Sequence, residues 1–249
     1  MHFHEQIYDL DELARFNLHI HTAFSNCAKP EMKLPDIIAA AEAAGLKAFA
    51  LTDHFNDDNS NEECLERNLY LRKEAAEIGT QIKILFGAEL SAYAPGKSLE
   101  SAEVRAELDY KLYSCNHYHL NFWGQPEDKT ARGYVEYSIA IISSLIISGK
   151  ADCIAHPLIG RFVRAFDDKT LLTREITDNE LGGLLELSKT AEVAWEINVG
   201  AILGDPLFGR RLWNLGREAG VVFNYGTDSH TLAGIDTTIL LPEVKIALS

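Results

Sequence analysis

The segment NLHIHTAFSN, residues 17–26, places His19 and His21 in an apolar run that is typical of a buried β-strand. Side chains alternate between the two faces of a strand, so His19 and His21 share one face while Leu18 and Ile20 share the other. Two imidazoles on one face can bind one metal ion together, and imidazole is a usual ligand of zinc, iron and manganese. The segment therefore predicts a strand that carries part of a metal site.

Similar apolar runs recur along the chain and alternate with helical patterns. Strands are predicted at residues 15–21, 47–52, 83–90, 110–116, 152–156, 191–198 and 221–228. Helices are predicted at residues 33–46, 61–79, 131–149, 178–190 and 206–220. This alternation indicates an α/β protein with a parallel sheet, and seven strands favour a barrel, although the pattern also permits an open sheet. The tail at residues 236–249 lacks a clear amphipathic pattern, so no closing helix is expected there.

Length, charge and cysteine content limit the kind of protein. The 249 residues suit one α/β barrel and contain no low-complexity linker, so we predict a single domain over residues 1–249. The net charge of −14 argues against long nucleic acid as a partner. The longest apolar run, residues 137–149, is shorter than the roughly 20 residues of a membrane span. The N-terminus is not a secretory signal and the four cysteines show no paired spacing, which predicts a cytoplasmic protein.

Ionisable side chains gather at or just past the ends of the predicted strands. In chain order they are His19, His21, Asp53, His54, Glu89, His117, His119, His156, Glu196, Asp228 and His230. The carboxyl ends of barrel strands open onto one mouth, so these residues should meet in space. Each motif alone is weak evidence, because strand histidines often pack in a core and Asp and Ser are common in turns. Folding alone does not require so many buried ionisable groups, since burying them is costly without a partner.

These motifs, in this order, resemble the PHP family, which is named for polymerase and histidinol phosphatase. They are LHIHT (18–22), LTDH (51–54), GAEL (87–90), NHYH (116–119), AHP (155–157) and GTDSH (226–230). The resemblance implies a distorted seven-stranded (βα)7 TIM-like barrel with a metal site at its C-terminal mouth. It also implies a metal-dependent phosphoesterase that hydrolyses a small phosphorylated substrate with a metal-activated water. Such a substrate would be a histidinol-phosphate-like metabolite, a nucleotide or a sugar phosphate.

The resemblance further implies two or three divalent ions of zinc, iron or manganese and assigns their ligands. One ion would be held by His19, His21, Glu89 and Asp228. A second would share Glu89, as a bridging ligand, with His117 and His156. A third would use His54 and His230, with Asp53 as a support outside the ligand set.

Catalytic and substrate-binding roles follow from the same resemblance. The catalytic candidates are Glu89, Asp228, His230 and His54, the last two as acids that could protonate the leaving group. Arg161 and Arg164 follow the AHP motif and are predicted to bind substrate phosphate, because guanidinium groups match phosphate geometry. His119 is a further predicted substrate contact.

The chain departs from the family pattern in the segment FSNCAKPEM, residues 24–32. Family members often carry an Asp or a His there, which completes the third metal site. This chain has Asn26 and Cys27 instead; the amide is a poor zinc ligand and the thiol favours a soft metal. We therefore expect a third site that is weaker, differently liganded or empty.

Three other interpretations of the same motifs stay open. A metal-dependent C–N hydrolase of the amidohydrolase kind also begins with HxH on the first barrel strand. That class usually bridges its metals with a residue of the fourth strand, whereas Glu89 lies on the predicted third strand. A PHP-type exonuclease fits poorly with the acidic charge. A non-catalytic module would be expected to have lost ligands that this chain retains.

Overall fold

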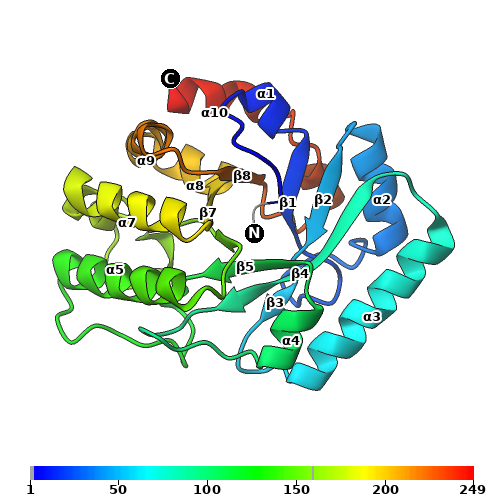
Figure 1. The fold of residues 1–249 in the computed structure, drawn as a ribbon, viewed down its shortest axis with the longest axis horizontal. Coiled ribbons are helices and arrows are strands. Elements are labelled where there is room, and N and C mark those ends of the chain that lie inside the picture. The colour runs from blue at the N-terminus through cyan, green and yellow to red at the C-terminus, as the bar shows by residue number, and fades with distance from the viewer. Residues whose placement is uncertain (1–2, 159) are drawn as a thin grey trace.

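The computed structural model describes residues 3–158 and 160–249 as a parallel sheet nearly closed into a barrel (Figure 1). The strand order is β1-β2-β4-β5-β6-β7-β8. The strands are β1 (Phe16–Ile20), β2 (Ala48–Leu51), β4 (Lys83–Ser91), β5 (Tyr110–Ser114), β6 (Cys153–Ile154), β7 (Ala194–Asn198) and β8 (Phe223–Gly226). A parallel bridge connects Ile20 of β1 with Ser229, which lies just past the end of β8. The predicted α/β TIM-like barrel is therefore confirmed.

A short strand that the sequence did not predict lies beside the sheet. This strand, β3 (His54–Phe55), pairs with β4 and sets His54 opposite Glu89. Thr52 and Asp53 separate β2 from β3, and the chain continues along β4 instead of entering a loop. This pairing brings an imidazole next to a carboxylate at the barrel mouth.

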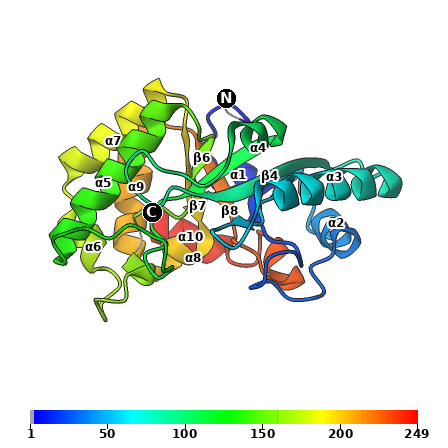
Figure 2. The ribbon, with the colours of Figure 1, turned by 90° about the horizontal axis from the view of Figure 1, so that it is seen from below.

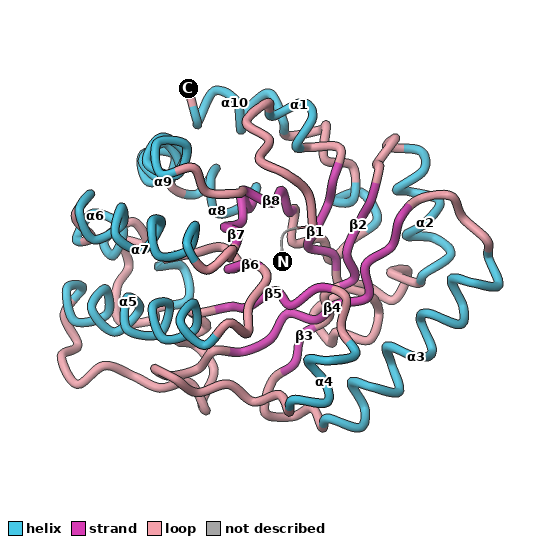
Figure 3. Tube along the Cα trace, in the orientation of Figure 1, coloured by secondary structure: helices cyan, strands magenta, loops and turns pink. Residues whose placement is uncertain are grey.

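Helices surround the strands on the outside of the barrel (Figure 3). They are α1 (Leu10–Leu13), α2 (Leu34–Ala43), α3 (Asn61–Ile78), α4 (Ala102–Glu107), α5 (Ala131–Ser148), α6 (Leu171–Glu175), α7 (Asp178–Thr190), α8 (Val199–Gly204), α9 (Pro206–Ala219) and α10 (Leu241–Leu248), with the 3-10 turns η1 (Gly160–Phe162) and η2 (Leu232–Ile235). All five predicted helices are present. Seen from below, α2 and α3 lie on one side of the sheet and α5, α7 and α9 on the other (Figure 2). Within the described residues, none of these helices has the length and apolar character that a membrane span requires.

The ends of the long helices carry local signals that explain where they begin and end. Ser60 and Glu63 form a capping box at the start of α3, in which each side chain binds the other residue's backbone N–H. Gly79 ends α3 with a φ of 74°, a left-handed conformation that glycine adopts without steric cost. Thr177 and Glu180 form a second capping box at the start of α7.

The expectation that no helix closes the chain is wrong, because α10 forms at Leu241–Leu248. Leu241, Val244 and Leu248 are buried, and the helix packs against α8 and α9. Ile246 of the same helix is 72% exposed, so an apolar residue on the outer face hides the amphipathic pattern in the sequence.

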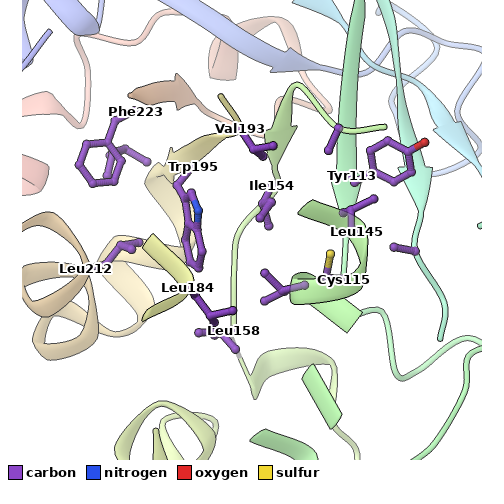
Figure 4. Packing of buried hydrophobic residues seen from close by; sticks show 14 of the residues in the cluster. Tyr113, Cys115, Leu145, Ile154, Leu158, Leu184, Val193, Trp195, Leu212 and Phe223 are labelled. Carbon is purple, nitrogen blue, oxygen red and sulfur yellow. The ribbon is translucent and has the colours of Figure 1, made fainter. Parts of the chain in front are cut away.

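Two apolar layers build the core around the strands. An interior cluster takes at least one residue from each strand region of the barrel: Leu18, Ala50, Leu85, Leu112, Cys153, Ala194 and Val222. The main outer layer packs β5–β8 against α5, α7 and α9, with Trp195 beside Leu184 and Leu212 (Figure 4). The Trp195 indole Nε1–H donates to Ser188 Oγ at 2.7 Å, so this buried donor has a partner. The interior layer fills the barrel below the mouth, and polar side chains lie at the strand ends above it.

The first strand contains an irregularity that changes which side chains share a face. Leu18 packs in the interior cluster, whereas Ile20 packs with the cluster beneath α2, so the expectation that they share a face is wrong. The register between β1 and β2 shifts between Asn17 and Ile20. A β-bulge of this kind re-aims side chains, and here it lets His19 reach the barrel mouth above Leu18.

Candidate metal centre

A cavity of about 340 Å³ opens at the carboxyl ends of the barrel strands. Eight of the predicted site residues line it: His54, Glu89, His117, His119, His156, Arg161, Asp228 and His230. His19 and His21 are fully buried at its base, within 3.6 Å of Glu89. The structure therefore brings together side chains that are scattered along more than 200 positions of sequence, from His19 to His230.

The first group of potential ligands is His19, His21, Glu89 and Asp228. The two imidazole Nε2 atoms lie 3.1 Å apart. Asp228 Oδ1 lies 3.4 Å from His19 Nε2 and 3.1 Å from His21 Nε2, and Glu89 Oε2 lies 3.4 Å from His19 Nε2. Four potential ligand atoms thus face one point.

Glu89 connects this group to a second one on its other side. Its Oε1 lies 3.0 Å from His156 Nε2 and 3.5 Å from His117 Nε2. The two oxygens of one buried carboxylate therefore face two different sets of imidazoles. A carboxylate placed in this way could bridge two ions.

A third group lies nearer the solvent and contains His21, His54 and His230. His54 Nδ1 lies 2.9 Å from Glu89 Oε2, and the ring of His230 stacks on that of His21 with centroids 4.3 Å apart. Cys27 Sγ lies 3.1 Å from His230 Nε2. Cys27, which lies in the segment expected to depart from the family pattern, is thus placed beside the third group.

The residues fit divalent metal ions by geometry and by hydrogen bonding. With zinc–nitrogen bonds of about 2.0–2.1 Å, tetrahedral geometry sets two ligand atoms roughly 3.3 Å apart. The separations of 3.0–3.6 Å in the first two groups lie close to that value. Glu89 Oε2 and His54 Nδ1 are buried 2.9 Å apart, and beyond the neighbouring imidazoles Glu89 Oε2 has no other hydrogen-bond donor among the described residues. Such buried polar atoms are costly unless a cation or another partner binds them.

At Glu89 and His21 the electrostatic surroundings favour the protonation states that bind metals, whereas at His19 and His54 the neighbouring carboxylates outweigh burial and raise the pKa of the imidazole. Burial opposes ionisation of Glu89, but the charge of His54 and hydrogen bonds from His156 and His19 hold its pKa well below the usual range. Burial and the neighbouring His54 lower the pKa of His21 to about 4, which keeps that imidazole neutral at neutral pH. Ionised carboxylate and neutral imidazole are the forms that coordinate metals.

Asp53 does not line the cavity, and its carboxylate binds the loop that follows β1. It accepts hydrogen bonds from the backbone N–H and the hydroxyl of Thr22, both at 2.7 Å, and from Ser25 Oγ at 2.7 Å. Ser25 Oγ in turn lies 3.3 Å from His21 Nδ1. This chain of contacts holds the loop that carries His21.

Two other polar residues hold the ligands, and the sequence patterns gave neither of them this role, although they placed Glu196 at a strand end and Asn116 in the NHYH motif. Glu196 Oε1 lies 2.8 Å from His19 Nδ1, and Asn116 Oδ1 lies 3.2 Å from His156 Nδ1. The backbones of His156 and Asp228 have positive φ values of 27° and 54°, a strained conformation that occurs often at functional sites.

The predicted substrate-binding residues differ in their positions. Arg161 lines the cavity, and its guanidinium lies over the Phe162 ring and 3.9 Å from Asp228 Oδ2. His119 also lines the cavity and stacks on Phe162 with centroids 4.8 Å apart. Arg164 is exposed and does not line the cavity. Burial lowers the pKa of His119, and the charge of Arg164 lowers it further.

Comparison with known structures supports the fold. Histidinol phosphate phosphatase (HisK) from Lactococcus lactis subsp. lactis Il1403, in complex with zinc, L-histidinol and phosphate, matches with a TM-score of 0.56 and 18% identity over 93% of each chain. A mannanase catalytic domain from Streptomyces sp. SirexAA-E matches with a TM-score of 0.43 and 14% identity, over 94% of this chain and 73% of that one. A β-mannanase from Streptomyces thermolilacinus matches with a TM-score of 0.41 and 11% identity, over 84% and 67%. The two mannanase similarities are too low to carry an argument.

Comparison with sequence families is more specific. A search of curated proteins found no match. The model of the PHP domain matches residues 17–198, which include the first five of the six motifs, from LHIHT to AHP. GTDSH, the last motif, lies beyond the matched range, yet the fold brings its Asp228 to within 3.4 Å of His19. The match spans well over half of the sequence, and the chain belongs to the PHP domain family.

Proposed function

We propose that this chain is a metal-dependent phosphatase that hydrolyses a small phosphorylated metabolite. The observation that carries the proposal is the position of Glu89, whose two carboxylate oxygens face two groups of buried imidazoles. Family membership supports a metal-dependent phosphoesterase. When bound, two ions would lower the pKa of a water molecule and neutralise charge that develops on the phosphoryl group.

The ligands in this proposal are the two groups that share Glu89. His19, His21 and Asp228 would hold one ion, and His117 and His156 the other. Glu89 would keep the two ions together because it contacts both groups. His54 and His230 would hold a third ion, and the nearby Cys27 thiol favours a soft metal such as zinc there.

Arg161 is the proposed phosphate-binding cation. It lies on η1 at the rim of the cavity and keeps a half-exposed guanidinium beside Asp228. A guanidinium can donate two parallel hydrogen bonds to phosphate oxygens. The cavity volume of about 340 Å³ suits a small metabolite rather than a long polymer.

His54 and His230 are the proposed sources of the proton for the leaving group when they do not hold metal. Both line the cavity and are partly exposed, with 24% and 28% of their side chains accessible. Solvent can therefore restore the proton after each turnover.

Hydrolysis of an aryl phosphate tests the proposal. The purified protein would be assayed as isolated, after removal of metal with a chelator, and after reloading with manganese, zinc or iron. We expect activity to disappear on stripping and to return with metal, and Glu89→Gln to abolish it. Glu77→Gln on the outer face of α3 is the matched control, because it makes the same change on an exposed residue.

Metal bound in stoichiometric amounts without hydrolysis of any phosphoester would refute the phosphatase. A panel of substrates should include sugar phosphates, nucleotides and histidinol phosphate, since the Lactococcus protein of the same fold is a histidinol phosphate phosphatase. Hydrolysis of amide substrates would instead support a C–N hydrolase. A single domain and a cytoplasmic location stay predictions.

A further inference from the structure

Glu196 is a buried carboxylate in the barrel interior, directly behind the metal centre. It lies on β7, and only 2% of it is exposed. Its Oε1 lies 2.8 Å from His19 Nδ1, and its Oε2 accepts a hydrogen bond from the His156 backbone N–H at 2.6 Å. Asn198 Nδ2 donates to Oε1 at 3.3 Å. One side chain therefore touches a residue from each of the two groups that share Glu89.

The contact with His19 determines which ring nitrogen faces the cavity. A carboxylate can only accept, so His19 Nδ1 carries the proton and donates it to Glu196. The lone pair of His19 then lies on Nε2, which is 3.4 Å from both Glu89 Oε2 and Asp228 Oδ1. Glu196 thus fixes both the tautomer and the ring orientation of this ligand.

The contact with His156 acts on the backbone rather than on the ring. His156 has a φ of 27°, a region that residues other than glycine rarely adopt. The short hydrogen bond from its N–H to Glu196 Oε2 stabilises this strained conformation. Asn116 holds the same residue from the other side, because its Nδ2 donates to the His156 carbonyl at 2.9 Å. Together these bonds leave His156 Nε2 at 3.0 Å from Glu89 Oε1.

A glycine on the neighbouring strand makes room for this arrangement. Gly226 of β8 pairs with Asn198 of β7. A Cβ atom at position 226 would lie 2.1 Å from Glu196 Oε1 and 2.8 Å from His19 Cβ, which real structures do not show. The packing therefore depends on both the carboxylate and the absence of a side chain beside it.

We propose that Glu196 is a positioning residue that couples the two metal groups through one carboxylate. It fixes the ring of His19 in one group and the backbone of His156 in the other. The inference rests on the proposed metal binding and adds a residue outside the ligand set. An amide in its place has a single acceptor oxygen, so it can satisfy either His19 Nδ1–H or His156 N–H but not both.

Zinc titration of the metal-free protein tests the inference. Wild type, Glu196→Gln and Ser188→Ala would be titrated in competition with a chromogenic chelator, and unfolding temperatures would be measured for each. Ser188→Ala is the matched structural control, because it removes the buried partner of Trp195, the strand neighbour of Glu196 on the opposite face. When a metal ligand loses its hydrogen-bond partner, metal binding weakens by about 10- to 100-fold. We expect zinc affinity to fall by this factor at both sites in Glu196→Gln.

A second readout reports the tautomer directly. The Nδ1–H proton of His19 should give a downfield NMR signal in the wild type and in Ser188→Ala, and that signal should shift or exchange away in Glu196→Gln. Should Glu196→Gln not fold, Glu196→Asp keeps the charge but is one methylene shorter, so its carboxylate no longer reaches both partners. It should weaken zinc binding in the same assay.

The outcomes separate this inference from the proposed function. The inference would be overturned if Glu196→Gln were less stable than wild type yet bound zinc at both sites with wild-type affinity. Glu196 would then have a purely structural role. If Glu196→Gln weakened zinc binding at only one of the two sites, Glu196 would not couple the two metal groups. Because the titration contains no phosphoester, a protein that binds zinc but hydrolyses nothing would refute the phosphatase and leave the inference intact.

Discussion

The ligand groups at the base of the cavity and the group at its rim are built differently. At the base, His19, His21, Glu89 and His156 are each at most 1% exposed. At the rim, His54 and His230 are 24% and 28% exposed, and Cys27 is exposed as well. The base residues lie in barrel strands or within two residues of a strand end, whereas at the rim His54 lies on β3 and Cys27 and His230 lie in loops.

The two regions also differ in the partners that hold their side chains. Glu196 contacts His19, Ser25 contacts His21, and Asn116 contacts His156. At the rim, His230 is held by a hydrogen bond to the carbonyl of Asp228, its neighbour two residues away. Burial and fixed partners reduce the cost of organising ligands when a metal binds. We therefore expect tight ions at the base and a weaker, exchangeable ion at the rim.

The largest effect should follow removal of a base ligand. In His156→Ala we expect metal affinity and phosphatase activity to fall by more than about 100-fold, since a lost ligand costs more than a lost partner of a ligand. Elemental analysis after dialysis, together with the aryl phosphate assay, measures both. His4→Ala is the control, because His4 does not line the cavity. Full metal content in His156→Ala would contradict the assignment of the base groups.

Removal of a rim ligand should have a smaller effect. In His230→Ala we expect the base ions to stay bound, the rim ion to weaken, and activity to fall by about 10-fold. The measurement is the number of zinc ions retained during stepwise chelation. Loss of all ions together would show that rim and base form one cooperative site, and the comparison between them would fail.

Arg161 tests whether substrate phosphate binds at the rim. Arg161→Ala should raise KM by at least about 10-fold without changing metal content, because it removes hydrogen bonds to a charged phosphate. Arg164→Ala is the matched control, since Arg164 does not line the cavity, and should change KM little. Equal effects of the two variants would argue for a general charge effect instead of a specific contact.

Cys27 offers a way to change the rim without removing a histidine. Cys27→Asp replaces a soft sulfur ligand with a hard oxygen ligand, so the ratio of manganese to zinc bound at the rim should rise several-fold. Competition between the two metals at equal concentration measures this ratio. Cys27→Ser serves as the control for loss of sulfur alone. An unchanged ratio in Cys27→Asp would show that Cys27 does not contact the rim ion.

The smallest effect is expected in the helical layer, far from the cavity. Glu180 at the start of α7 accepts hydrogen bonds from Arg132 of α5 and from the Thr177 backbone, which lower its pKa to about 2. A lowered pKa stabilises the fold above the ordinary value of 4.5, and this contribution is lost as the pH falls through about 2.

Glu180→Gln should therefore reduce the free energy of unfolding by about 1 kcal/mol or less at pH 7, because solvent screens a partly exposed pair. The difference from wild type should shrink between pH 4.5 and pH 2. Urea unfolding at several pH values measures it, with Glu186→Gln on the exposed face of α7 as the control. A difference that stays constant with pH would show that the charge of Glu180 contributes nothing.

Much of the fold follows from local patterns. Each of the seven predicted strands overlaps an observed one, because apolar runs bounded by turn residues are local signals. The helix that begins at Asn61 was predictable in the same way, since its start and its end at Gly79 are marked in the sequence. Local patterns failed at β3, a two-residue strand that exists only because β4 lies beside it. They failed again at α10, where the exposed Ile246 masks the buried face.

Motif order also identified the ionisable residues at the barrel mouth. The side chains at strand ends share a face by alternation, so His19 and His21 could be paired from sequence alone. Their partners could not be found this way. His19 and Glu196 are 177 residues apart, and Cys27 and His230 are 203 residues apart. No local periodicity connects such positions.

The amino-acid sequence alone thus determines the class of fold and the kinds of ligand, because strand alternation, helix caps and turn motifs are properties of neighbouring residues. Tertiary structure decides which oxygen of Glu89 faces which imidazoles, how the bulge in β1 aims His19, and that Glu196 lies behind both groups. These features depend on closure of the sheet between β1 and the residues after β8. They arise only when distant segments pack within hydrogen-bond distance of one another.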